Sequence, residues 1–147
     1  MPLIGRPAAP VLPPGDSGVA APAAPVFDNI AAVPASARGR VTAVAAAVEQ
    51  NLPLDFVSTV SSGGFAVGTL ALNAEQVGLE LAGRSVAELT NVSCDPTSGC
   101  RWAVAEASPS LLILEARVGN VGRGALELMR DDDGSWCVVR ARPSATR

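Results

Sequence analysis

The chain has 147 residues, a net charge of −3 and neither histidine nor tyrosine. This length suits one domain with its own core, and the negative charge argues against nucleic acid as a partner. The lack of histidine removes the commonest general base and the commonest metal ligand, and the scarcity of aromatic residues argues against base stacking. We therefore expect no catalytic residues, no metal and no cofactor, and we predict that the protein is not an enzyme.

Residues 1–34 differ in composition from the rest of the chain. They hold eight of the twelve prolines, and proline favours an extended conformation because it fixes φ and removes a hydrogen-bond donor. Their apolar side chains follow no period and cannot form a core. We predict an extended arm over residues 1–34 that docks on another protein surface, followed by a compact domain over residues 35–147. The prolines of this interaction arm are Pro7, Pro10, Pro13, Pro14, Pro22 and Pro25.

One helix is predicted over residues 36–50. Its apolar positions recur at helical spacing and form one stripe: Val41, Val44, Ala45 and Val48. Ser36 is a suitable N-cap for this helix. Asn51 can adopt the left-handed conformation at its end, and Pro53 prevents its continuation.

The middle of the chain is interpreted as strands and turns. Residues 54–60 and 65–72 are predicted to be strands of a hairpin, joined by the Ser-Ser-Gly-Gly sequence at 61–64. Residues 76–81 alternate between apolar and polar side chains, which is typical of a strand with one buried face. Residues 85–92 are interpreted as a further strand.

Four strands are predicted in the last third of the chain, over residues 101–106, 111–118, 125–130 and 135–142. The second of these begins with four consecutive apolar residues at 111–114, which indicates a central strand covered on both sides. The Asp-Asp-Asp-Gly sequence at 131–134 predicts a hairpin turn between the last two strands.

These elements predict an α+β fold, mainly antiparallel β, with about seven or eight short strands and one N-terminal helix. The expected form is a sandwich or a curved sheet with a packed helix. With its terminal Gly134-Ser135-Trp136-Cys137, the order over residues 36–140 resembles the globular part of a type IV pilin, which implies a surface filament subunit. The order of helix and strands is also similar to that of cystatin-like and NTF2-like domains, in which a helix packs on a curved sheet.

The segment from Cys94 to Cys100 is the most distinctive one. Asp-Pro and Ser-Gly pairs between the two cysteines build a tight loop, and the flanking strands would bring the thiols together. We predict a Cys94–Cys100 disulfide in an oxidising compartment. Cys137 would then be a buried free thiol, although pairing with Cys94 or Cys100 is an open alternative.

Other candidate sites have simpler structural interpretations. The acids at 131–133 suggest calcium at first sight, but they point in different directions in a short turn. Glu115 interrupts the most apolar strand and is interpreted as a buried or interface acid paired with an arginine. The glycine-rich segment 119–124 joins two strands and fits no phosphate loop, and the Asn91 glycosylation sequon is short enough to occur by chance.

The arm and the missing catalytic residues favour a structural or assembly subunit, such as a virion decoration, connector or tail component of a bacteriophage. The alternatives are the pilin-like filament subunit and a secreted or periplasmic ligand-binding domain of cystatin/NTF2-like type. The expected partners are copies of the chain or neighbouring subunits, in a virion or an extracellular setting. No membrane span is expected, because turn residues 61–64 interrupt the longest uncharged stretch.

Overall fold

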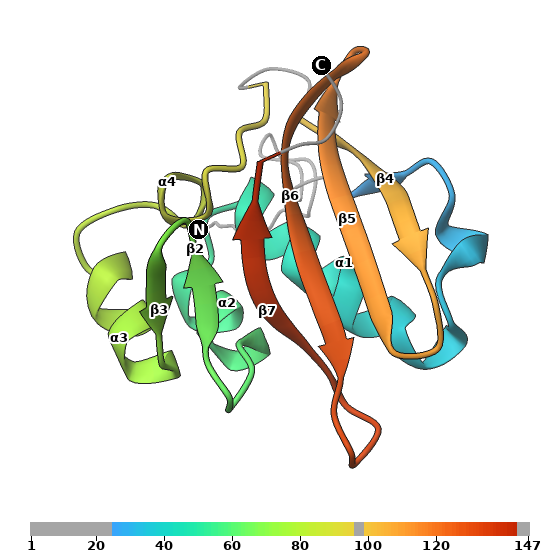
Figure 1. Cartoon of the computed structure of the whole chain (residues 1–147). Helices are drawn as coiled ribbons and strands as arrows, with labels where there is room; N and C mark the ends of the chain where they lie inside the picture. The colour runs from blue at the N-terminus through green and yellow to red at the C-terminus, as the bar shows by residue number, and fades with distance from the viewer. Residues whose placement is uncertain (1–24, 96–98, 144–147) are drawn as a thin grey trace, which may run out of the picture.

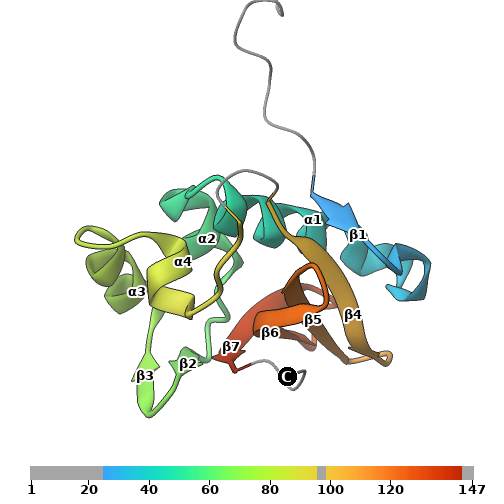
Figure 2. The same cartoon turned by 90° about the horizontal axis from the view of Figure 1, so that it is seen from above.

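The computed structural model describes residues 25–95 and 99–143. Seven strands form one mixed sheet in the order β1-β4-β5-β6-β7-β2-β3, and α1 and α2 lie behind it (Figure 1). The sheet curves around these helices (Figure 2). The elements in chain order are β1 (Val26–Phe27), the 3-10 turn η1 (Ile30–Ala32), α1 (Ala35–Glu49), α2 (Pro53–Thr59), β2 (Phe65–Val67), β3 (Leu70–Leu72), α3 (Ala74–Leu81), α4 (Val86–Thr90), β4 (Arg101–Ala107), β5 (Leu111–Val118), β6 (Val121–Arg130) and β7 (Trp136–Arg142). The predicted α+β class is confirmed, in the form of a curved sheet with a packed helix.

The four strands β4 to β7 follow one another as antiparallel neighbours, as predicted. Gly119 and Asn120 form the turn between β5 and β6, and Gly119 has a φ of 63°, which suits glycine. The predicted turn at 131–134 joins β6 to β7, with the Gly134 amide donating to the Asp131 carbonyl at 2.9 Å. We call β4 to β7 the meander. Short turns join its consecutive strands, so it is built from contacts between segments that are close in sequence.

The β5 strand is buried more deeply on one face than on the other. Leu112 and Leu114 are fully buried on the face that packs against α1, whereas Leu111 and Ile113 are half-buried. The expectation of cover on both sides is therefore only half correct. The reason is that α1 and α2 lie on the same side of the sheet (Figures 1 and 2).

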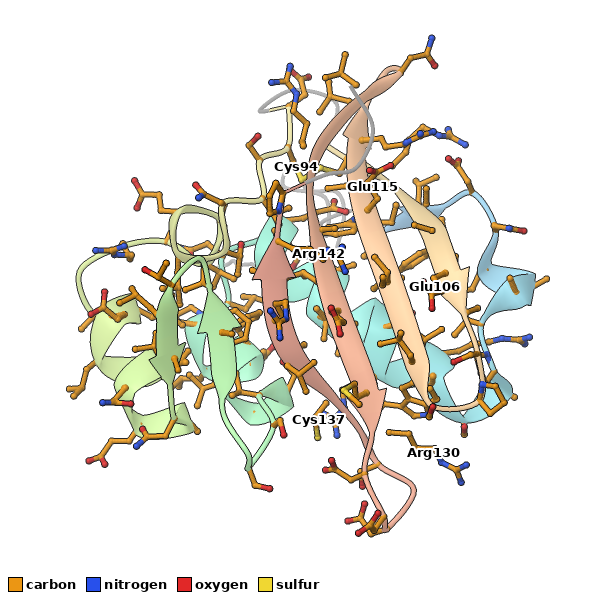
Figure 3. All side chains as sticks on the ribbon, in the orientation of Figure 1. Cys94, Glu106, Glu115, Arg130, Cys137 and Arg142 are labelled. Atoms are coloured by element: carbon orange, nitrogen blue, oxygen red, sulfur yellow. A yellow bond between two sulfur atoms is a disulfide. The ribbon has the colours of Figure 1, made fainter. Side chains whose placement is uncertain are left out.

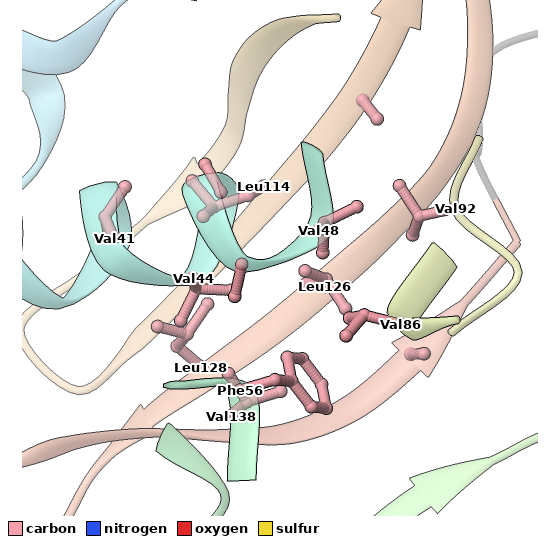
Figure 4. Packing of buried hydrophobic residues seen from close by; sticks show 14 of the residues in the cluster. Val41, Val44, Val48, Phe56, Val86, Val92, Leu114, Leu126, Leu128 and Val138 are labelled. Atoms are coloured by element: carbon pink, nitrogen blue, oxygen red, sulfur yellow. The ribbon is translucent and has the colours of Figure 1, made fainter. Parts of the chain in front are cut away.

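The helix α1 is the one predicted from the sequence, and its apolar stripe packs on the sheet (Figure 4). The stripe is buried in full or almost in full, and its members are Val41, Val44, Ala45 and Val48. The N-cap is Pro34 and not Ser36, because the first helical residue is Ala35. The Ser36 hydroxyl instead accepts a hydrogen bond from the Trp136 indole at 3.3 Å. Asn51 has a φ of 54°, the left-handed conformation predicted for it.

The predicted strand at 54–60 is wrong, because α2 occupies this segment. Pro53 is the first residue of α2, a position where its fixed φ and missing N–H are tolerated. Asp55 lies in the first turn, where its charge interacts favourably with the helix dipole. Pro53 therefore not only prevents the continuation of one helix but also begins the next.

The predicted strands at 76–81 and 85–92 are also wrong, because they are the helices α3 and α4. Each helix begins with a reciprocal capping box, formed by Asn73 with Gln76 and by Ser85 with Glu88. In α3, Val77 is fully buried, whereas Leu79 is 70% exposed. The alternation of apolar residues therefore does not correspond to one buried face.

The predicted strand at 65–72 is divided into a small hairpin of its own. Gly68, with a φ of 58°, lies in the turn between β2 and β3. The β2 strand then pairs in parallel with β7, so that Ala66 lies opposite Arg140. This long-range pairing connects β2, which lies between α2 and α3 in the sequence, to β7, the last strand of the meander.

The end of the predicted arm belongs to the folded domain. β1 pairs in parallel with β4, and Val33 is 1% exposed. Asp28 on this segment forms an ion pair with Arg101 of β4. Phe27 and Val33 supply the apolar contacts that hold residues 26–33 on the domain. The first 24 residues lie outside the described part of the chain, and their extended conformation stays a prediction.

Candidate binding groove

The space between α1 and the sheet is occupied by core side chains. The helix contributes mostly valine and alanine, and the sheet contributes leucine, valine and tryptophan. Figure 4 shows part of this packing, with valines of α1 facing leucines of the sheet. The candidate site lies instead at the upper end of the sheet in Figure 1, where β2, β7 and α4 end and β6 begins. A cavity of about 520 Å³ lies there. Its lining residues are Val67, Gly68, Thr90, Asn91, Ser93, Gly122, Arg123, Gly124, Ala141, Arg142 and Pro143.

A smaller cavity of about 210 Å³ adjoins the first one. Its lining residues are Ser93, Cys94, Asp95, Val118 and Arg123. Ser93 and Arg123 line both cavities, so the two are parts of one depression. We call this depression the Arg123 groove. It runs from the disulfide at Cys94 to the end of β7.

The groove depends on a close approach between β6 and the segment after α4. Gly124 has a φ of 108°, and a Cβ atom placed there would lie 2.6 Å from the Asn91 carbonyl oxygen. Only glycine permits this approach without a shift of the backbone. The Ser93 amide donates to the Arg123 carbonyl at 3.1 Å and ties the two segments together.

The groove carries an excess of positive charge. Glu127 Oε1 lies 3.3 Å from Arg142 Nη1 and 3.8 Å from Arg140 Nε. One carboxylate is therefore shared by two arginines and leaves one positive charge in excess. Arg123 is exposed, and no acidic group of residues 25–95 and 99–143 forms an ion pair with it. Asp95 lies at the far end of the groove and has interactions of its own. The arrangement can therefore attract an anion, although the chain as a whole is negatively charged.

The structure places the two cysteines of the predicted loop in a disulfide. Cys94 and Cys100 are bridged across six residue positions, and Cys100 is 5% exposed. Figure 3 labels Cys94 and Arg142 at the same end of the sheet. The sequence predicted the pair but not its place in the wall of a groove. That place results from the approach of β6 to the segment after α4.

Cys137 is the free thiol, as predicted for this pairing, and it is half-buried. Its Sγ donates to Asp131 Oδ2 at 3.3 Å. Burial and this carboxylate raise the pKa of the Cys137 thiol. Since the thiolate is the reactive form, the surroundings of Cys137 disfavour a nucleophilic role.

The remaining candidates have structural roles. Glu115 is 4% exposed and accepts a hydrogen bond from Arg117 Nε at 2.9 Å, so the predicted buried acid is confirmed. In the turn after β6, Asp133 accepts from the Ser135 amide at 2.9 Å, which lowers the pKa of this carboxyl. In the described ranges, no three metal-binding side chains come together. No helix in those ranges is long and apolar enough to cross a membrane.

The glycines at 122 and 124 were missed as site residues. They lie inside β6, and both line the groove. Glycine within a strand often marks a bulge or a close approach of another segment, which was the available signal. Of the interaction-arm prolines, only Pro25 lies in the described part, directly before β1, whereas Pro7, Pro10, Pro13, Pro14 and Pro22 lie outside it.

No protein-family model and no curated protein matches the sequence. Among solved structures, the chain is similar to one described as a putative ketosteroid isomerase from Shewanella frigidimarina, with a TM-score of 0.47 and 12% identity. The likeness covers 81% of this chain and 99% of the other. At this TM-score and identity, the likeness transfers no activity to this chain.

This comparison corrects one prediction. We predicted that the protein is not an enzyme because the sequence lacks histidine, the commonest general base. We withdraw that prediction, because this similar solved structure is described as a putative ketosteroid isomerase. Glutamate and aspartate can also transfer protons, so the lack of histidine does not by itself exclude catalysis.

Proposed function

We propose that this domain binds a small anionic molecule in the Arg123 groove. The observation that carries the proposal is the position of Arg123, which lines both cavities and forms no ion pair with the described acids. A guanidinium can bind a carboxylate or a phosphate through two parallel hydrogen bonds. Asn91 and Ser93 line the larger cavity and offer further polar groups.

The lining also favours a ligand with an apolar part. Val67, Ala141 and Pro143 contribute apolar surface to the larger cavity, and Val118 contributes it to the smaller one. An anion with a short hydrocarbon body would place its charge at Arg123 and its chain against these residues. Each buried methylene group would add about 0.8 kcal/mol to the binding free energy.

The test is an amide NMR titration of the oxidised protein with hexanoate, acetate, inorganic phosphate and hexanol. We expect hexanoate to shift the amides of Ser93, Arg123 and Gly124 at lower concentrations than acetate does. Hexanol lacks the charge and should bind more weakly. Hexanoate and acetate carry the same carboxylate, so their comparison isolates the contribution of the hydrocarbon, whereas phosphate tests whether a different anion also binds.

The matched variants are Arg123→Gln and Arg130→Gln, which remove one positive charge each from the same strand. Arg123 lies in the groove, whereas Arg130 lies at the other end of β6 (Figure 3). Arg123→Gln should abolish the shifts, and Arg130→Gln should retain them. Equal losses in the two variants would show non-specific attraction and would reject the groove as the site.

The assembly subunit that the sequence favoured stays a prediction. Its motivation is the proline-rich arm, and residues 1–24 lie outside the described part. Deletion of residues 1–24 tests it, because an assembly subunit should lose its self-association and keep a folded domain. A ligand-binding domain should keep its affinity for hexanoate in the same deletion.

A further inference from the structure

The disulfide connects one wall of the Arg123 groove to the sheet. Ser93, Cys94 and Asp95 form this wall in the smaller cavity. Cys100 directly precedes β4 and is 5% exposed, so it is fixed by the packing of the core. The bridge between Cys94 and Cys100 therefore anchors the wall to a rigid part of the fold.

The other contacts of this wall are non-covalent, since Cys94 packs against the hydrophobic core and Asp95 has interactions of its own. The Ser93 amide donates to the Arg123 carbonyl at 3.1 Å. Asp95 and Gly99 exchange two backbone hydrogen bonds, of 3.2 and 2.9 Å, but these lie within the loop that the disulfide closes. They tie Asp95 to Gly99, next to Cys100, and so support the disulfide, but they are not covalent and can open when it is reduced. Within the described ranges, the backbone hydrogen bond that joins residues 93–95 to β6 is that of Ser93.

We propose that the oxidation state of the Cys94–Cys100 pair sets the affinity of the Arg123 groove for its anion. This inference rests on the proposed function. A dithiol reductant would break the S–S bond and transfer two electrons and two protons, so that both cysteines become thiols and the reductant becomes a disulfide. The wall would then keep its Ser93 hydrogen bond to β6 without the covalent anchor, and local opening of residues 93–95 would become easier. An anion that contacts Ser93 and Arg123 together would lose part of its preorganised site.

The experiment measures hexanoate binding to the full chain before and after treatment with dithiothreitol, and to the variant Cys94→Ser/Cys100→Ser. We expect the affinity to fall about fivefold or more in the reduced protein and in the variant. Hydrogen exchange of the Ser93 amide is measured on the same samples and should become about tenfold faster. The Leu126 amide in the core of β6 serves as the internal reference for global stability and should change little.

Cys137→Ser is the control variant. It removes the free thiol, which is outside the groove, and it should retain both the affinity of the oxidised protein and its loss on reduction. If oxidised and reduced wild-type protein bind hexanoate equally well, the inference is rejected while the proposed function stands. If the oxidised protein binds neither hexanoate nor phosphate, the proposed function fails and the inference fails with it. Loss of Leu126 protection on reduction would show that the disulfide acts on the whole fold, which also rejects the inference.

Discussion

The meander from β4 to β7 and the segment from α2 to α4 were predicted from the same kinds of pattern, with opposite outcomes. In the meander, apolar runs and an Asp-Gly turn correctly predicted four strands. In residues 53–90, the strand prediction was correct only for β2 and β3, and similar alternation predicted strands where three helices lie. The difference is that the helices begin with Pro53 and with two capping boxes. Local hydrogen bonds at the start of a short segment therefore outweigh its apolar periodicity.

The largest expected effect tests the meander as the stable part of the fold. Leu114 is a residue of β5, and its side chain is fully buried on the face that packs against α1 (Figure 4). Leu114→Ala should lower the free energy of unfolding by about 2–5 kcal/mol, through lost transfer energy and the cavity left behind. Urea unfolding measures it, with Leu79→Ala in α3 as the comparison. Leu79 is 70% exposed, so its substitution should change the free energy by less than about 0.5 kcal/mol. Similar losses at both positions would contradict the comparison.

The next effect tests the junction between the two regions. Gly124→Ala places a Cβ atom 2.6 Å from the Asn91 carbonyl oxygen at a φ of 108°. We expect a loss of about 2–4 kcal/mol, because strain and a backbone clash add together. Gly119→Ala is the control, since Gly119 also has a positive φ but a Cβ atom there would meet no other atom within 4 Å. Its cost should be about 1 kcal/mol. Equal costs would show that β6 does not approach Asn91 closely.

A smaller effect tests the capping boxes that distinguish the helical segment. Asn73 accepts from the Gln76 amide at 2.8 Å, and Asn73→Ala removes this acceptor. Asn73→Ala should lower the free energy of unfolding by about 1 kcal/mol. Asn73→Ser should lower it much less, because serine is also a good N-cap. Thermal unfolding followed by circular dichroism compares the two variants. If Asn73→Ala leaves the free energy of unfolding unchanged, the packing of Val77 and Leu81, and not the cap, sets the helical conformation of α3.

The smallest effect concerns Cys137 in the meander. Burial and the Asp131 carboxylate raise the pKa of this thiol in the folded state. The stability that the neutral thiol contributes is therefore fully present below the pKa of the unfolded chain, and it is lost as the pH rises through the higher native value. At about pH 8.5, iodoacetamide should react more slowly with Cys137 in the folded protein than in urea. Asp131→Asn should make the folded thiol react faster, and an unchanged rate would show that the carboxylate has no influence.

The sequence by itself determined the parts of the fold that depend on neighbours in the chain. Valine spacing determined α1, the Gly119 and Gly134 turns determined two hairpins, and the short Cys94–Cys100 spacing indicated the cysteine pair. These features need only local geometry. The sequence also contained the capping boxes of α3 and α4, but its alternation of apolar residues obscured them.

Only the tertiary structure decided the position of the groove. Its lining comes from β2, β6, β7 and the segment after α4, which are distant in sequence. They meet because β2 pairs with β7 and because Gly124, which has no Cβ atom, allows the backbone of Asn91 to come close. Such contacts depend on sheet order and on the close approach of backbones, and neither follows from local periodicity. For the same reason, Arg123 looks like an ordinary surface arginine in the sequence and lies at the centre of a groove in the fold.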